Sequence, residues 1–374
     1  MKIETLAIHA ADQPEITRDV TAAIHLSTTF QKAEDGSLPG GHLYSRPSNP
    51  NRDQLERALA ALEGGAAALA FSSGSAATSA VLQSLSPGDH VLVPQDAFYG
   101  TQVLLKNIMS NWGLKHSQAN MQDLAEVERA LAAKPRLVWL ESPSNPLLGV
   151  TDLRSVIALA QKAGALVACD NTVATPMLQR PLELGADMVM HSVTKFLSGH
   201  SDVLSGALVF RENGSLFERV QHIQRETGGV PSPFECWLTM RGLQTFPYRV
   251  RAHCENAQRV AEFLARHPRI EAVHYPGLPS HPGHKIATSQ MNGGFGGLLS
   301  MQVKGGREAA FKVCAAVKIF THATSLGGTH SLIEHRASVE GPNTRSPENL
   351  LRLSIGLEHW EDLIADLEQA LGKA

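Results

Sequence analysis

Four short apolar runs in the middle of the chain constrain the fold more than any other feature of the sequence. Each has the length of a strand, and they cover residues 91–93, 137–140, 166–169 and 188–190. Between the second and third runs, residues 153–160 carry a helical stripe that Gly164 ends. Thr151 or Asp152 can cap this helix. Repeated strand–helix–strand units of this length predict an α/β fold with a parallel sheet covered by helices on both faces.

The pattern differs on either side of this region. The first fifty residues are rich in Thr, Ser, Pro and Gly and show little periodicity, as an extended arm would. After about residue 240, amphipathic helices around 255–266 and 360–371 alternate with Gly/Pro loops. We therefore expect three parts: an N-terminal arm at 1–50, a large α/β domain at 51–240 and a smaller α+β C-terminal domain at 241–374.

Composition indicates a globular protein that acts on a small molecule. The chain has 374 residues, 43% of them hydrophobic, and a formal net charge of -3, so it has no basic field for nucleic acid or anionic lipid. The N-terminal stretch lacks the continuous apolar segment of a signal peptide, and no later stretch approaches a membrane span. We expect a cytoplasmic protein. Its four widely spaced cysteines form no CxxC pair and are expected to be buried thiols.

Polar residues that follow the last two apolar runs suggest a site. Asp170 ends one run, and Lys195 follows the next, 25 residues further on. Ligands bind at the carboxyl ends of parallel strands, and this spacing places both residues at neighbouring strand ends. Such a pair would serve pyridoxal 5′-phosphate (PLP), because a lysine amine can form the Schiff base while an acid keeps the pyridine nitrogen protonated. A surface lysine with a capping aspartate is the alternative for these residues alone.

Two further segments have the form of cofactor contacts. Residues 71–77 make a small-residue turn before a helix, which suits a phosphate cradle, although close packing alone also explains such turns. Residues 141–146 end a strand in a proline-bounded turn that would hold the Asn145 amide at the sheet edge, although an ordinary proline turn would look the same.

Taken together, the motifs of the chain resemble the Cys/Met-metabolism family of PLP enzymes. That family includes cystathionine γ-synthase, cystathionine γ-lyase, cystathionine β-lyase and methionine γ-lyase. The resemblance runs over nearly the whole chain, and the segments that carry it are Tyr44–Arg46, Ser48–Pro50, Ser73–Gly74, Glu141–Pro146, Asp170–Pro176, Ser192–Lys195, Ser232–Phe234, Arg241–Leu243, Tyr275–Leu278, Ser325–Gly328 and Leu351–Ser354.

The resemblance implies a fold-type I PLP enzyme with a mixed, mostly parallel sheet between helices. It makes Lys195 the Schiff-base lysine and proton shuttle, and Asp170 the partner of the pyridine nitrogen. It also implies a homotetramer built as a dimer of dimers, in which the arm reaches the active site of the neighbouring subunit. The remaining cofactor contacts that it implies are Tyr44 and Arg46 from the neighbouring subunit, together with Gly74, Ser75, Asn145, Thr172, Ser192 and Thr194.

Substrate contacts follow from the same resemblance. Arg352, helped by Ser325, should bind the substrate α-carboxylate, a task that suits the bidentate guanidinium. The aromatic residue that stacks on the ring is usually a tyrosine two positions after an aspartate, where this chain has Phe98. Tyr99 stands one position further and would be the catalytic phenol if the loop shifts locally; otherwise Lys195 carries more of the proton transfer. Thr324 replaces a glutamate that helps many members to select the distal amino group of cystathionine, so we include it among the substrate-binding residues.

The resulting function is a trans-sulfuration reaction. We favour γ-elimination of cystathionine to cysteine, 2-oxobutanoate and ammonia. The alternatives, in order, are γ-replacement on an O-acylhomoserine and β-elimination, with methionine γ-lyase activity also open. A non-catalytic PLP-binding regulatory protein is disfavoured because the lysine, the aspartate and the arginine are all present. No metal is expected, since the loop histidines His274, His281 and His284 are not joined by Asp, Glu or Cys.

Overall fold

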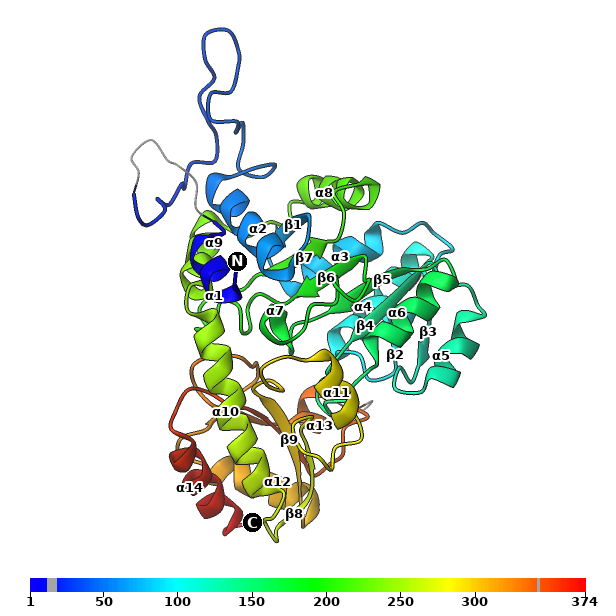
Figure 1. Cartoon of the computed structure of the whole chain (residues 1–374), viewed down its shortest axis with the longest axis vertical. Helices are drawn as coiled ribbons and strands as arrows, with labels where there is room; N and C mark the ends of the chain where they lie inside the picture. The colour runs from blue at the N-terminus through cyan, green and yellow to red at the C-terminus, as the bar shows by residue number, and fades with distance from the viewer. Residues whose placement is uncertain (12–18, 342–343) are drawn as a thin grey trace.

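Two units, each a sheet packed against helices, make up the structure, and the long helix α10 (Phe246–Leu264) connects them (Figure 1). The computed structural model describes residues 1–11, 19–341 and 344–374, so residues 12–18 of the predicted arm lie outside it. Within the described residues, the larger unit is built on a seven-stranded sheet and the smaller unit on a five-stranded sheet. The predicted α/β class, with a smaller second unit, is confirmed. The predicted boundary near residue 240 falls within α9 (Pro233–Leu243) and stays a prediction.

The larger sheet is mixed but mostly parallel. Its order is β1-β7-β6-β5-β4-β2-β3, and only the pairs that involve β7 are antiparallel. The four apolar runs of the sequence lie within β2, β4, β5 and β6, so these strand predictions are confirmed. Central strands such as β4 and β7 are buried along their whole length, which explains their continuous apolar sequences. The strands are β1 (Ala67–Phe71), β2 (His90–Pro94), β3 (Lys115–Ala119), β4 (Leu137–Glu141), β5 (Leu166–Asp170), β6 (Met188–His191) and β7 (Gly206–Phe210).

Helices cover both faces of this sheet because alternate strand residues point to opposite sides. On β4, Val138 and Leu140 pack with α5 and α6, whereas Leu137 and Trp139 pack with α3, α4 and α8. Asp152 caps α6 and accepts a hydrogen bond from the backbone of Ser155, which settles the choice between the two predicted caps. The helices of this unit are α2 (Pro50–Glu63), α3 (Gly74–Gln83), α4 (Tyr99–Asn107), the 3-10 helix η1 (Met109–Trp112), α5 (Leu124–Leu131), α6 (Leu153–Lys162), α7 (Thr175–Leu178), α8 (Ser215–Thr227) and α9.

The smaller unit has a mostly antiparallel sheet in the order β10-β11-β12-β9-β8. Helices α10 and α12 pack on it, and α14, which matches the predicted helix at 360–371, packs on these two helices. The elements after α10 are β8 (Ile270–His274), α11 (His284–Gln290), β9 (Leu298–Val303), α12 (Gly306–Ala316), β10 (Thr321–His322), β11 (Leu332–His335), α13 (Arg336–Glu340), β12 (Leu350–Ser354) and α14 (Trp360–Leu371).

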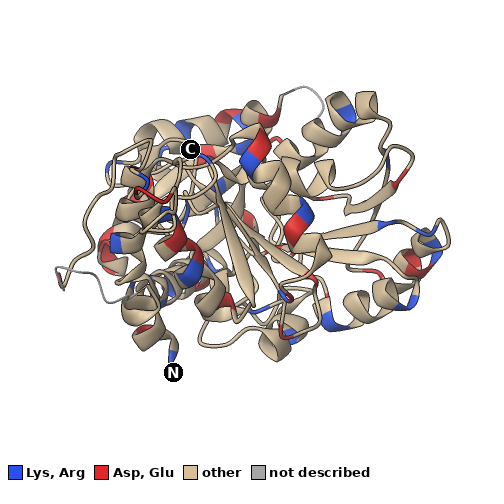
Figure 2. Ribbon diagram, turned by 90° about the horizontal axis from the view of Figure 1, so that it is seen from above, with Lys and Arg blue, Asp and Glu red and all other residues tan. Residues whose placement is uncertain are grey.

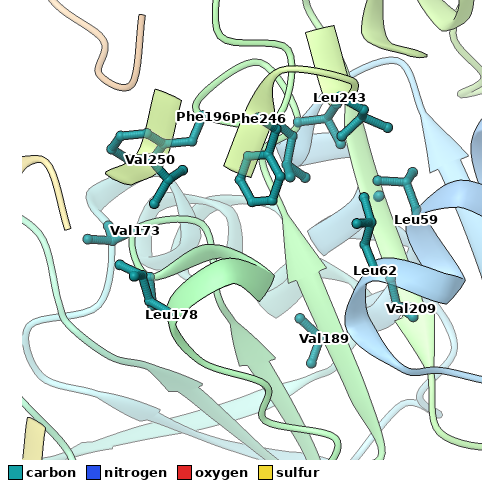
Figure 3. Packing of buried hydrophobic residues seen from close by; sticks show 14 of the residues in the cluster. Leu59, Leu62, Val173, Leu178, Val189, Phe196, Val209, Leu243, Phe246 and Val250 are labelled. Carbon is teal, nitrogen blue, oxygen red and sulfur yellow. The ribbon is translucent and has the colours of Figure 1, made fainter. Parts of the chain in front are cut away.

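One apolar cluster joins the larger sheet to the helices that lead into the smaller unit. Figure 3 shows Leu59 and Leu62 of α2 beside Val209 of β7, with Phe246 of α10 and Val189 of β6 in the same cluster. All five side chains are buried. This cluster excludes water from the face of β6 that lies opposite α3.

The N-terminal segment divides into a helix and an exposed arm. Residues 3–9 form α1 (Ile3–His9), which packs on α2 and α10 and was not expected from the weak periodicity of this segment. The contacts of α1 with distant helices explain why its sequence alone does not indicate a helix. Residues 19–49 project from the body as a long extended loop (Figure 1). Leu26 is 68% exposed and Leu43 48% exposed on this arm.

The surface carries both charge signs in alternation. In Figure 2, Lys and Arg are interspersed with Asp and Glu over the helices. No helix among the described residues is long and apolar enough to cross a membrane. All four cysteines are free and buried, as predicted.

Candidate active site

A cavity of about 230 Å³ opens at the carboxyl ends of the parallel strands of the larger sheet. It lies where the sequence predicted a site. Polar side chains from the ends of β4, β5 and β6 meet the N-terminus of α3 there. The residues predicted to contact the cofactor within one chain all line it, namely Gly74, Ser75, Phe98, Asn145, Asp170, Thr172, Ser192, Thr194 and Lys195.

Lys195 follows β6 in a turn, and its amine enters the cavity. Lys195 Nζ donates a hydrogen bond to Ser325 Oγ over 2.8 Å. Burial, and then the positive charge of Arg352, lower the pKa of Lys195 to about 8. Ser325 has a φ of 86°, in the left-handed region that non-glycine residues rarely adopt. This backbone conformation presents its hydroxyl to Lys195 and its carbonyl to Arg352.

Asp170 lies at the end of β5, beside the end of β6. Its Oδ1 accepts a hydrogen bond from the backbone N–H of Thr172 over 3.0 Å. The Thr172 hydroxyl in turn accepts from the backbone N–H of Ser192 over 2.8 Å, which ties the two strand ends together. Burial raises the pKa of the Asp170 carboxyl, while hydrogen bonds from Thr172 and the charge of His191 oppose that rise.

The turn before α3 forms a cradle that suits an anion. Ser73 caps α3 by accepting a hydrogen bond from the backbone of Ala76, which leaves the first amides of the helix facing the cavity. A Cβ at Gly74 would lie only 3.0 Å from Ser192 Cβ, and one at Gly206 would lie 2.2 Å from the Ser73 carbonyl oxygen. Only glycine fits at position 206, and a side chain at position 74 would require Ser192 to shift. The Thr194 hydroxyl hydrogen-bonds the backbone of Ser205 in both directions.

Glu141 holds two of the predicted contacts, a role that the sequence reasoning missed. Glu141 Oε2 accepts from the backbone N–H of Phe98 over 2.7 Å, and Oε1 accepts from that of Asn145 over 3.2 Å. Its signal in the sequence is position, because Glu141 ends β4 and pairs in register with Asp170 at the end of β5. Burial, and then the nearby Asp170 carboxyl, raise the pKa of Glu141.

The structure separates Phe98 from Tyr99. Phe98 lines the cavity and Tyr99 does not, although the two side chains are exposed to a similar extent, 38% and 42%. Phe98 is therefore the aromatic side chain whose ring lies at the cavity wall. The catalytic role of Tyr99 stays a prediction.

Arg352 is buried in an ion-pair network beside the cavity and is not one of the residues that line it. Its Nη2 lies 3.0 Å from Glu334 Oε1 and donates to the Ser325 carbonyl oxygen over 2.7 Å. Its Nη1 lies 3.4 Å from Asn145 Oδ1, which connects the network to the cavity. Arg336 Nη1 lies 2.6 Å from the same Glu334 oxygen. These contacts fix the plane of the guanidinium, as recognition of a carboxylate requires.

Six predicted residues are not among those that line this cavity. Ser325 and Arg352 reach it only through their bonds to Lys195 and Asn145, and Tyr99, Tyr44, Arg46 and Thr324 are the other four. Tyr44 and Arg46 belong to the arm, where Arg46 hydrogen-bonds the carbonyl of Arg225. Thr324 is exposed beside Ser325. Among the described residues, no group of three or more His, Cys, Asp or Glu could hold a metal ion.

The groups around the cavity fit pyridoxal phosphate. A reactive amine, a buried carboxyl, an aromatic ring and an anion cradle are the partners that its aldehyde, pyridine nitrogen, ring face and phosphate need. Gly74 meets the steric requirement of the cradle, since a side chain there would contact Ser192.

Comparison with known proteins agrees with this fit. The family model described as "Cys/Met metabolism PLP-dependent enzyme" matches residues 4–372, and the chain belongs to that family. The cystathionine gamma-synthase of Mycobacterium tuberculosis is 48% identical over 375 residues, which cover 98% of this chain and 96% of the relative. The cystathionine gamma-lyase of Dictyostelium discoideum is 42% identical over 381 residues, which cover 100% of this chain and 98% of the relative.

Solved structures agree as well. The cystathionine gamma synthase of Xanthomonas oryzae pv. oryzae, in complex with aminoacrylate and cysteine, has a TM-score of 0.96 and 41% identity. That match covers 100% of this chain and 98% of the other. The predicted family, fold class and cofactor are thereby confirmed, and the protein is a PLP-dependent enzyme of trans-sulfuration. The similar proteins include both synthases and lyases.

Proposed function

We propose that this protein catalyses γ-replacement, in which the thiol of cysteine takes the place of the acyloxy group on Cγ of an O-acylhomoserine, forming cystathionine and releasing the acid as a carboxylate. One observation carries the proposal: the Lys195 amine and the Arg352 guanidinium both bind Ser325, through its hydroxyl and its carbonyl oxygen, respectively. A proton carrier thus lies beside a group that can bind an α-carboxylate. Chemistry at the α and γ carbons of an amino acid requires that arrangement.

Sequence identity favours γ-replacement, whereas the motifs alone favoured γ-elimination of cystathionine. Identity is 48% with the mycobacterial gamma-synthase and 42% with the Dictyostelium gamma-lyase, over almost the same length. Elimination of cystathionine is the second candidate, because the gamma-lyase matches over 98% of its length. β-Elimination comes third.

The residues of the cavity would bind the cofactor and transfer protons. Asp170 would pair with the pyridine nitrogen, and the Gly74 and Ser75 amides, with the Ser192 hydroxyl, would bind the phosphate. When bound, pyridoxal phosphate withdraws electrons from the substrate Cα, which permits loss of its proton. Lys195, with a pKa of about 8, can take up and return protons near neutral pH.

The far end of the site would hold the substrate. Arg352 would bind its carboxylate, and Glu334 and Asn145 would keep the guanidinium in place. The apolar side chains of Val173 and Leu326 in the cavity wall would limit access of water.

Product analysis tests this proposal. The purified, PLP-loaded protein is mixed with an O-acylhomoserine and cysteine, and in parallel with cystathionine alone. The proposal is supported if cystathionine forms with a kcat/KM larger than that for breakdown of cystathionine. If cystathionine is instead cleaved to 2-oxobutanoate and cysteine faster than it is formed, the activity is γ-elimination and the proposal is wrong. Release of pyruvate and homocysteine would indicate β-elimination. Lys195→Ala, which lacks the proton carrier, is the inactive control.

We also propose a homotetramer with active sites shared between subunits, acting in the cytoplasm. The exposed arm supports sharing, because Leu26, Leu43 and Tyr44 carry apolar surface away from their own body. Four free cysteines fit a reducing compartment.

Mixed subunits test the sharing. Lys195→Ala and Arg46→Ala are each expected to be nearly inactive alone, whereas a refolded mixture should regain part of the activity, because some sites then receive both intact residues. No recovery, with assembly shown by light scattering, would argue against sharing.

A further inference from the structure

A buried arginine on the connecting helix α10 binds the chain directly after Lys195. Arg249 is 6% exposed, and its Nη1 donates a hydrogen bond to the Phe196 carbonyl oxygen over 2.8 Å. Its Nη2 donates to the carbonyl oxygens of Leu197, over 3.2 Å, and Gly242, over 2.8 Å. The proposed chemistry does not use Arg249, and no predicted contact includes it.

Arg249 forms no ion pair with a carboxylate of the described residues. Burial is the only cause that shifts its pKa, which falls to about 10, so the guanidinium is charged at neutral pH. A buried charge costs free energy unless it is compensated. The carbonyl oxygens supply that compensation here, and the planar fork of a guanidinium can bond several of them at once.

The turn that carries Lys195 depends on these bonds. Lys195 lies in the loop 192–205 between β6 and β7, so no strand or helix fixes its backbone. Within the loop, Ser198 Oγ donates to the Thr194 carbonyl oxygen over 3.1 Å, and the Gly199 N–H donates to the Lys195 carbonyl oxygen over 2.8 Å. The next two carbonyl oxygens of the turn accept from the guanidinium on α10. The helix therefore completes the hydrogen bonding of this turn.

Helix α10 also holds the ring of Phe196. His253 lies one helical turn after Arg249, and its ring meets the Phe196 ring edge-on, with the ring centroids 5.3 Å apart. Positions four residues apart share one face of a helix, so Arg249 and His253 reach Phe196 from the same face. Val250 of α10 and Phe196 belong to one buried apolar cluster (Figure 3). The residue next to Lys195 is thus fixed through both its backbone and its ring.

Two close approaches leave the turn little room to move. Gly199 has a φ of 73°, and a Cβ there would overlap Nη1 of Arg249. A Cβ at Gly327 would lie 2.6 Å from the backbone nitrogen of Phe196. Gly327 follows Ser325, whose hydroxyl accepts the hydrogen bond from Lys195 Nζ. The turn is therefore packed between α10 and the loop that binds the lysine amine.

We propose that Arg249 is a positioning residue for Lys195. By binding the carbonyl oxygens of Phe196 and Leu197, it fixes the turn so that the lysine amine enters the cavity. The amine can then condense with the aldehyde of pyridoxal phosphate, which forms a C=N bond and releases one water. The inference rests on Lys195 being the residue that forms this Schiff base.

Binding of two forms of the cofactor tests the inference without any turnover. Pyridoxal phosphate can bond Lys195, whereas pyridoxine 5′-phosphate, in which CH₂OH replaces the aldehyde, can fill the cavity but cannot form that bond. The affinity of the full-length apo-protein is measured by absorbance titration for the first and by competition for the second. Arg249→Met should lower the preference for pyridoxal phosphate about tenfold, because a looser turn must be ordered before the amine can react. Affinity for pyridoxine 5′-phosphate should change little.

A second arginine on the same helix serves as the control. Arg251 lies two positions further along α10, is 48% exposed and hydrogen-bonds Glu4 of α1. Arg251→Met should leave both affinities unchanged. Arg249→Lys retains the positive charge but lacks the fork that bonds several carbonyl oxygens, so it should also lower the preference. It decides the question if Arg249→Met does not fold.

Lys195→Ala separates the inference from the role of the lysine itself. Loss of the preference in both Lys195→Ala and Arg249→Met supports the inference. If Lys195→Ala loses the preference while the Arg249 variants keep it, Arg249 does not position the lysine. Equal weakening of both cofactor forms in the Arg249 variants would show a purely structural role and overturn the inference. If Lys195→Ala keeps the preference, the Schiff-base role of Lys195 is itself wrong.

Discussion

Replacement of Arg352 by Met should make the Lys195 amine less reactive at neutral pH. Burial, and then the charge of Arg352, lower the pKa of Lys195 to about 8, while Glu334 acts in the opposite direction. At pH 7 about one tenth of such an amine is neutral, compared with roughly one part in 3,000 for a lysine of ordinary pKa. Removing Arg352 also takes from Glu334 one of its two arginine partners, since Glu334 Oε1 lies 3.0 Å from Arg352 Nη2 and 2.6 Å from Arg336 Nη1. Both changes favour the protonated amine.

The expected change in the pKa of Lys195 follows from the same charges. A rise of about one unit in the pKa of Lys195 lowers the neutral fraction at pH 7 about tenfold. Competitive labelling of the apo-protein with acetic anhydride between pH 6 and 10, read by mass spectrometry of the Lys195 peptide, measures that pKa directly. Arg345→Met is the control, because Arg345 bonds the Gln95 carbonyl and Gln118 instead. A midpoint that stays near 8 in Arg352→Met would refute the reasoning.

Three further predictions concern Glu334, Phe98 and Glu56. Glu334→Gln should lower the free energy of unfolding, measured in urea, by about 3 kcal/mol, because it leaves the buried Arg352 without its ion-pair partner. Glu348→Gln is the control, because it removes an exposed ion pair with Arg307 and should have little effect. Phe98→Ala should weaken the affinity for pyridoxal phosphate about tenfold, because the stacking contact with the ring is lost. Tyr99→Phe should leave that affinity, measured by absorbance titration, unchanged. The opposite result would show that Tyr99, not Phe98, stacks on the ring. Burial raises the pKa of Glu56 to about 7 from 4.5, so the folded state retains a proton there that the unfolded state has lost, and stability should fall as pH rises through 4.5 to 7. Glu56→Gln should flatten that decline in melting temperatures, and an unchanged slope would contradict this origin.

Much of the larger unit could be predicted because its signals are local. A strand buried on both faces needs a continuous apolar run, so β2, β4, β5 and β6 are visible in the sequence. The edge strand β3 has the sequence KHSQA and is mostly exposed, so it carries no such run. Helix α1 likewise depends on packing against α2 and α10 rather than on its own periodicity.

The cofactor contacts could be predicted for a related reason. Asp170 and Lys195 follow apolar runs in chain order, and parallel strands bring such residues to one edge. Glu141 also follows a run, but its role depends on backbone amides of Phe98 and Asn145 that only the folded loops bring to it. No local pattern indicates which of Phe98 and Tyr99 faces the cavity, because a one-residue shift in the loop exchanges them.

The sequence by itself determined the family, the cofactor and the strand ends that hold it, since these depend on residue types in a fixed order along the chain. Only the tertiary structure decided which side chains support those residues. Arg249 and Phe196, whose carbonyl oxygen it binds, are 53 positions apart, and Glu334 meets Arg352 through the register of two antiparallel strands. Such pairs arise from packing and strand register, which are set by the whole fold and leave no periodic trace in the chain.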